Sequence, residues 1–159
     1  MTELNEIEMT VVNWFADGVK VLGMPRSLGE IYGLLFISKK ALALDDFVEK
    51  LSLSKGSASQ GLNMLHSLGA IKKTEQSANR KVHYEADTEL KILVGGFIRE
   101  QVRPHLESGR KKVKDLKNLI KKQGPSSDGD FYQNRIDKMD RWMDRGRIVA
   151  PMLQKLLGE

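Results

Sequence analysis

Residues 54–69 have the sequence SKGSASQGLNMLHSLG, and the organisation of the whole chain follows from this segment. At 100° per residue its apolar positions share one narrow stripe, formed by Ala58, Leu62, Leu65 and Gly69. The opposite face is polar and lacks any carboxylate, and it consists of Gly56, Ser59, Gln60, Asn63 and Ser67. This pattern predicts a short amphipathic helix with an unusual outer face, because exposed helix faces ordinarily mix Glu with Lys.

The side chains of this outer face have the chemistry that nucleic acid requires. The side-chain amide of Asn or Gln can form two hydrogen bonds with the edge of one adenine, and a Ser hydroxyl can donate or accept a hydrogen bond. Lys55 belongs to the first turn of the predicted helix, where backbone amides also favour phosphate. A Ser-rich helix that is merely solvated is the alternative, and the flanking segments bear on the choice between the two.

Composition narrows the class of protein. The chain has 159 residues, 40% of them apolar, which is enough for one compact unit with helical extensions. It has no cysteine, which excludes disulfides and thiolate metal sites. No apolar run is long enough to cross a membrane, and no charged segment followed by an apolar one opens the chain, so we expect a cytoplasmic protein.

The charge of the chain is positive and unevenly distributed. A net charge of +5 and an isoelectric point near 9.4 suit an acidic partner such as nucleic acid, or simple solubility. The net charge is −3 over 1–25, +2 over 26–88, +6 over 89–122 and 0 over 123–159. The middle of the chain is therefore basic, and its ends are not.

Three helices precede the polar one. Helical spacing predicts the first over 2–22, and the capping-box pattern Ser-Leu-Gly-Glu opens a second over 27–37. Two aspartates at the start of 45–51 favour the N-terminus of a short third helix. A turn at 51–53 then leads to Ser54, the predicted N-cap of the next helix. The apolar stripe of the first helix consists of Leu4, Ile7, Val11, Phe15, Gly18, Val19 and Leu22.

After Gly69 the period changes from helical to alternating. Residues 70–76 and 81–86 flank the polar turn 77–80, which predicts a two-stranded ribbon, and 41–43 is a candidate brief strand. The helices at 27–37, 45–51 and 54–68, followed by a β-ribbon, have the order of a winged helix-turn-helix. The predicted fold class is therefore mainly α with a small β-ribbon.

The remainder of the chain is helical. A long helix is predicted from 88 to 122 with a kink at Pro104, followed by a linker at 124–129 and a last helix interrupted by Pro151. Together with the first helix this gives more apolar helix surface than one small winged domain can cover. The surplus predicts a partner, most simply a second copy of the chain.

Three segments resemble MarR-type regulators, and most closely the GbsR-like repressors of glycine betaine synthesis. They are GMPRSLGEIYGLL at 23–35, LSLSKGSAS at 51–59 and LHSLGAI at 65–71. The resemblance implies a homodimeric cytoplasmic transcriptional regulator, a repressor, with the helix at 54–68 in the major groove and the wing at 70–86 in the minor groove. It also implies domains at 1–23 (dimerisation), 24–88 (winged helix-turn-helix) and 89–159 (helical dimerisation).

The candidate DNA contacts lie on the predicted helix and ribbon. Arg80 occupies the position where the family's wing usually carries an arginine, whereas Ala43 replaces a common capping hydroxyl before the third helix. The basic run 110–117 keeps an apolar period and is better explained as a charged outer face. The contact set is Ser54, Lys55, Ser57, Ser59, Gln60, Asn63, Lys72, Lys73, Arg80 and Lys81.

No residue pattern indicates catalysis or a cofactor. His66, His83 and His105 fall on separate predicted elements, so a metal site is not expected. Gly56-Ser57 lacks the Lys-Ser/Thr ending of a phosphate-binding loop, and no nucleophile motif occurs. We therefore expect no enzyme, no metal and no cofactor. A winged-helix module that makes only protein contacts is the alternative function, although it would not require a carboxylate-free helix face or a basic wing.

A small-molecule effector is a further expectation. Effector clefts in this fold class commonly lie between the winged domain and the dimerisation helices, and relatives in the GbsR-like branch sense choline-type compounds. Aromatic faces attract quaternary ammonium groups through cation–π contacts. The candidate pocket consists of Trp14, Phe15, Tyr32, Phe97 and Trp142, and plain core packing of these aromatic residues is the alternative.

Overall fold

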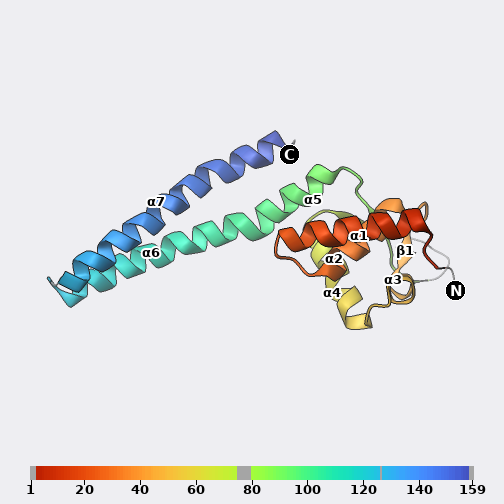
Figure 1. The fold of residues 1–159 in the computed structure, drawn as a ribbon, viewed down its shortest axis with the longest axis horizontal. Coiled ribbons are helices and arrows are strands. Elements are labelled where there is room, and N and C mark those ends of the chain that lie inside the picture. The colour runs from red at the N-terminus through yellow and green to blue at the C-terminus, as the bar shows by residue number, and fades with distance from the viewer. Residues whose placement is uncertain (1–2, 75–79, 126, 158–159) are drawn as a thin grey trace. The chain divides into compact units, whose positions relative to one another are not determined.

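The computed structural model describes residues 3–74, 80–125 and 127–157 (Figure 1). Contacts divide the chain into two compact units, Met1–Gly96 and Phe97–Glu159. Helices dominate both units, and one small antiparallel sheet belongs to the first. The predicted fold class is confirmed, and the first helix packs within the same unit as the winged helix.

The first unit is built on the helices α1 (Glu6–Val21) and α2 (Arg26–Ile37). α1 begins at a capping box, which was not predicted: the Asn5 side chain accepts from the Glu8 backbone amide, and the Glu8 carboxylate accepts from the Asn5 backbone amide, both at 2.9 Å. α2 lies close to α1, because a Cβ atom at Gly29 would overlap the Phe15 carbonyl.

Two expectations about these helices were wrong. The capping box at 27–30 does not form, since α2 already begins at Arg26 after Pro25, whose φ of −60° suits a helix start. The buried face of α1 is Val12, Phe15, Ala16 and Val19, whereas Ile7 is 69% exposed and Leu22 36% exposed. α2 selects this face, because its glycines admit the α1 backbone there.

Arg26 fixes the start of α2 against α1. Its guanidinium donates to Asp17 Oδ1 and to Asn13 Oδ1, each at 2.9 Å. It also lies 3.4 Å from Glu30 Oε1, one turn further along α2. Burial raises the pKa of the Glu30 carboxyl, and the Arg26 charge opposes that rise.

The predicted helix-turn-helix is confirmed as α3 (Leu44–Leu51) and α4 (Lys55–Ser67). Ser52 adopts the left-handed conformation between them, with φ of 52°. Although Ala43 offers no capping side chain, the Asp46 carboxylate accepts from the Ala43 amide at 2.8 Å and holds the start of α3. Gly69, with φ of 75°, follows the end of α4 as expected.

The sheet has three strands in the order β1-β3-β2. β1 (Leu42–Ala43) and β2 (Ile71–Thr74) each pair antiparallel with β3 (His83–Ala86). The described strands begin at Ile71 and His83 rather than at 70 and 81, and residues 75–76 of the first predicted strand lie outside the described residues. The Tyr32 hydroxyl donates to the Asp87 carbonyl at 2.7 Å, which ties the end of β3 to α2. Most of the predicted turn 77–80 lies outside the described residues.

The predicted long helix has a different internal geometry. α5 (Leu90–Phe97) leads into a π-helical turn, η1 (Ile98–Val102), and then into α6 (Arg103–Gln123). Pro104 lies in the first turn of α6, where its missing amide is tolerated, and the irregular turn precedes it. Within the first unit, a Cβ atom at Gly96 would overlap the Leu68 carbonyl, so α5 touches the end of α4.

The second unit is a hairpin of α6 and α7 (Ser127–Leu156), which lie side by side in Figure 1. Val113, Ile136 and Ala150 are buried between them. The expected interruption at Pro151 was wrong, because α7 continues through this residue to Leu156. Contacts with α6 flank it: Gly146 packs against Leu106 before it, and Arg103 donates to Gln154 Oε1 at 3.1 Å after it. Within the described ranges, no helix is long and apolar enough to cross a membrane.

Candidate nucleic-acid interface

The outer face of α4 is exposed along its length. Lys55, Ser59, Gln60 and Asn63 point to solvent, whereas Ala58, Leu62 and Leu65 are at most 2% exposed. α4 itself contains no carboxylate, so its outer face offers amides, hydroxyls and one cation. We call the four exposed residues the α4 outer face.

Two serines of the predicted contact set have a structural task. The Ser54 hydroxyl accepts from the Ser57 amide at 3.1 Å and donates to the Ser57 hydroxyl at 3.0 Å. Ser54 is therefore the predicted N-cap, and Ser57 is half-buried. Because these hydroxyls already bond each other, they have less capacity for an outside partner than Ser59 does.

Close packing sets the position of α4 on α2. A Cβ atom at Gly61 would lie 2.5 Å from Ile31 Cδ1, the far end of a side chain, so a larger residue at this position would require Ile31 to shift. A groove of about 310 Å³ runs beside this contact, next to the α4 outer face. Its lining was not foreseen from the sequence and consists of Pro25, Ser27, Leu28, Ser57, Gln60, Gly61 and Met64.

The two ribbon lysines are exposed but do not share a face. Lys72 is opposite Glu85 in the register of the sheet, and Lys73 is opposite Tyr84. Since neighbouring side chains of a strand point to opposite faces, one flat surface cannot contact both lysines.

Arg80 and Lys81 lie in the segment just before β3. Arg80 is exposed and has a φ of 52°, a conformation that non-glycine residues rarely adopt. Lys81 Nζ lies 3.1 Å from Asp45 Oδ2 in α3, in an ion pair whose two side chains are 61% and 63% exposed. Asp45 is thus a residue near the wing that sequence reasoning missed, because 36 residues separate the partners.

The five aromatic residues of the predicted effector pocket have different surroundings. Phe15 and Tyr32 are buried with edge-to-face ring centroids 4.9 Å apart. Trp14, 64% exposed, lines with Phe15 a hollow of about 260 Å³ between α1 and α5. Phe97 and Trp142 belong to the second unit, where Trp142 is 73% exposed. The pocket as a set of five stays a prediction.

The described residues show no cluster suited to a metal ion. Among them, no group of three or more His, Cys, Asp or Glu side chains comes together. His83 Nδ1 lies 2.9 Å from the Lys81 carbonyl, an ordinary local hydrogen bond.

Sequence comparison relates about half of the chain to a known repressor. No protein-family model matches. The HTH-type transcriptional repressor GbsR of Bacillus subtilis (strain 168) is 32% identical over 77 residues, which are 48% of this chain and 42% of that protein. The chain thus matches less than half the length of this relative. Over that part, the predicted resemblance to GbsR-like regulators is confirmed.

Structural comparison covers nearly the whole chain. A solved structure, the crystal structure of a transcriptional regulator, superposes with a TM-score of 0.69 at 14% identity and covers 96% of both chains. At this identity the likeness concerns the fold alone, and it agrees with a winged helix extended by long helices.

Proposed function

We propose that this chain, which resembles GbsR-like regulators, is a sequence-specific regulator of transcription that binds double-stranded DNA as a homodimer and acts as a repressor. In this proposal α4 enters the major groove, and the wing at 70–86 reaches the minor groove. The observation that carries the proposal is the α4 outer face, which is exposed, amide-rich and without a carboxylate.

The alternative of a pure protein-docking module fits this face less well. Protein interfaces are centred on buried aromatic and aliphatic anchors, whereas the α4 outer face has none. Its Gln60 and Asn63 amides match adenine edges, and Lys55 at the start of the helix matches a phosphate. The cations of the ribbon add further phosphate contacts.

The homodimer is supported by the exposed apolar surface of α7. Trp142, Val149 and Leu156 recur every seven residues and are 73%, 47% and 82% exposed. A stripe of this kind on a long helix is typical of a helix-to-helix interface. A second copy is the simplest partner, since it presents the same stripe.

The proposal also includes an effector of the quaternary-amine class. The exposed face of Trp14 offers a cation–π contact beside the hollow between α1 and α5. Calorimetry with choline and glycine betaine, with and without bound DNA, tests it. No heat and no change in DNA affinity would remove this ligand class.

Selection of bound fragments from a random-sequence duplex pool, followed by anisotropy titration, tests the DNA-binding function. Gln60→Ala with Asn63→Ala is expected to change the selected bases. The control, Gln123→Ala with Asn134→Ala, removes one Gln and one Asn from exposed positions elsewhere and is expected to select the same bases as the wild type. If the two double variants select the same sequence, α4 does not read bases.

A separate variant tests the wing. Arg80→Ala is expected to cost about 1–3 kcal/mol in DNA affinity if its guanidinium enters a narrow minor groove. Binding with wild-type affinity would show that the wing does not contact DNA.

A further inference from the structure

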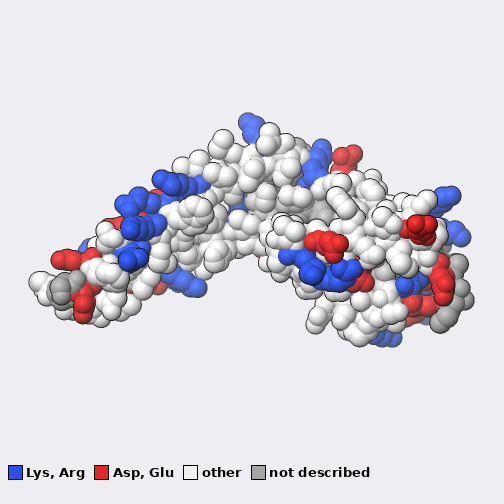
Figure 2. Space-filling model, in the orientation of Figure 1, with Lys and Arg blue, Asp and Glu red and all other residues white. Residues whose placement is uncertain are grey.

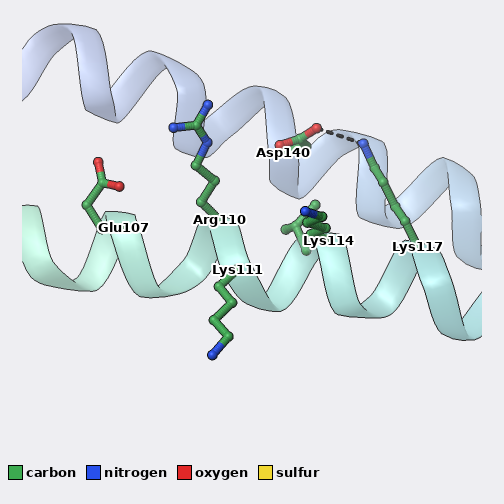
Figure 3. A pocket seen from close by; sticks show the side chains of 7 residues that line it. Glu107, Arg110, Lys111, Lys114, Lys117 and Asp140 are labelled. Atoms are coloured by element: carbon green, nitrogen blue, oxygen red, sulfur yellow. Dashed lines mark hydrogen bonds and ion pairs between the residues drawn. The ribbon is translucent and has the colours of Figure 1, made fainter.

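The second unit carries a groove between α6 and α7 that is lined mainly by cations. Its volume is about 550 Å³. Figure 3 shows Arg110 and Lys117 extending toward α7, whereas Lys111 points away from it. The complete lining is Glu107, Arg110, Lys111, Val113, Lys114, Lys117 and Asp140.

Four cations form a row along one side of α6. Arg110, Lys114, Lys117 and Lys121 follow at intervals of four, three and four residues, which places them on one stripe of the helix. At 1.5 Å per residue the row is about 16 Å long. We call these four residues the basic row, and Figure 2 shows Lys and Arg side chains gathered along this hairpin.

The row retains most of its charge. Lys117 Nζ donates to Asp140 Oδ2 at 2.8 Å and lies 3.9 Å from Asp137 Oδ1, and the hydrogen bond to Asp140 raises the pKa of Lys117. This pairing neutralises the carboxylate that α7 contributes to the groove. In the part of the chain that the structure describes, Arg110, Lys114 and Lys121 have no ion-pair partner.

These features differ from an ordinary solvated helix face. Such a face alternates its charges, so that most cations pair with a carboxylate three or four residues away. α6 has eight Lys and Arg residues against two carboxylates. Asp115 lies on another side of the helix, and Glu107 lines the groove near its Arg110 end, where the described structure gives it no ion pair with the row. The uncompensated cations point to a polyanionic partner.

We infer that the basic row binds the phosphate backbone of duplex DNA outside the base pairs that α4 contacts. This inference rests on the proposed function. Phosphates of one strand follow every 3.4 Å of duplex axis, so a row of about 16 Å spans roughly four or five of them. DNA is favoured over an acidic protein segment, because it has regularly spaced charges and is already the proposed ligand.

Salt-dependent binding of the full chain to mixed-sequence duplex DNA tests this inference. Arg110→Gln with Lys114→Gln removes two charges from the row. Lys112→Gln with Lys122→Gln removes two from other sides of the same helix and is the matched control. The row variant is expected to lower the slope of log affinity against log salt by about 2 per chain, whereas the control keeps the wild-type slope.

A charge-conserving variant, Arg110→Lys with Lys114→Arg, should restore the wild-type slope, and circular dichroism checks that all variants fold. Equal slopes for the row variant and the control overturn the inference while the proposed function stands. Loss of polyglutamate binding by the row variant, with DNA binding unchanged, also overturns it and identifies an acidic protein partner. Wild-type protein that binds no duplex DNA at all rejects the proposed function itself.

Discussion

The ion pair between Lys81 and Asp45 limits what the wing offers to a phosphate. Because the 3.1 Å contact places a carboxylate beside Lys81, a phosphate that approaches this lysine also meets a negative charge. Because both side chains are mostly exposed to water, that repulsion costs on the order of 1 kcal/mol, the value for unit charges about 4 Å apart in bulk water. Asp45 is thus a restraint on affinity as well as an anchor for the wing.

We expect Asp45→Asn to raise DNA affinity about threefold to tenfold, because it frees Lys81 and removes the nearby anion. Anisotropy titration with duplex DNA measures the change. Glu49→Gln, an exposed position on the same helix, removes the same charge and serves as the control. Identical affinities for the two variants would mean that Lys81 does not contact phosphate.

Tyr32 confers a pH dependence on the stability of the first unit. Its ring is 0% exposed, and burial together with the charge of Asp87 raises the pKa of its hydroxyl from 10.0 to about 12. Between these values the unfolded chain loses the phenolic proton while the folded chain keeps it. The free energy of unfolding therefore falls as the pH rises from 10 toward 12.

The contribution of Tyr32 to this fall is about 2–3 kcal/mol. Urea unfolding at a series of pH values measures it, and Tyr32→Phe is expected to flatten the curve in this range. Tyr132→Phe makes the same change at a residue that is 49% exposed and should leave the slope unaltered. A Tyr32→Phe protein with the wild-type slope would contradict the assignment.

At the scale of elements, the packing of α1 on α2 depends on a missing side chain. A methyl group at Gly29 would overlap the Phe15 carbonyl, and backbone cannot move aside as a flexible side chain can. Gly18 provides a contrast on α1, because no atom lies within 4 Å of the position where its Cβ would be. The same substitution should thus have opposite effects at the two sites.

Gly29→Ala is expected to lower the free energy of unfolding by about 1–3 kcal/mol through overpacking. Gly18→Ala should raise it by roughly 0.5–1 kcal/mol, because alanine loses less backbone entropy in a helix. Chemical denaturation of both variants decides the point. Equal shifts of the same sign would show that the glycines act only through helix propensity.

The sequence predicts elements whose signals are local. Ser54 caps α4 as predicted, and the helix exposes its polar face as the 3.6-residue period requires. The ribbon strands follow from alternation. The predicted start of α2 at the capping motif 27–30 was wrong, because Pro25 and the contacts of Arg26 place the first turn of the helix earlier in the chain. The π-helical turn at 98–102 has no sequence signature, because hydrogen-bond register is settled by packing on neighbouring elements.

In the candidate site, too, the features that follow from local helix or strand geometry could be predicted, whereas those that depend on the tertiary fold could not. Exposure of Lys55, Gln60 and Asn63 follows from helical geometry alone. The Lys81–Asp45 pair does not, since it joins residues on separate elements that only the tertiary fold brings together. The opposite orientations of Lys72 and Lys73 follow from strand geometry, once the strand bounds are fixed.

At the scale of the whole molecule, the apolar stripe of α7 predicts the assembly. Light scattering at micromolar concentration should give twice the 17.9 kDa mass of one chain. Trp142→Gln with Leu156→Gln is expected to shift the mass toward the monomer, because it places two polar amides in the stripe. Arg141→Gln with Lys155→Gln alters the two preceding, exposed positions and should leave the dimer intact. A monomeric wild-type chain would reject the dimer.

The contact of Gly96 with the Leu68 carbonyl gives α5 a mechanical role. Because no side chain lies between them, the backbones of Gly96 and Leu68 are in direct contact, and close-packed backbone atoms cannot be compressed further. A shift of α5 toward Leu68 by a few tenths of an ångström would therefore displace the last turn of α4, because the two backbones are in contact. Anything that pushes on α5 from the hollow beside Trp14 would accordingly be felt at the helix that we propose to read DNA.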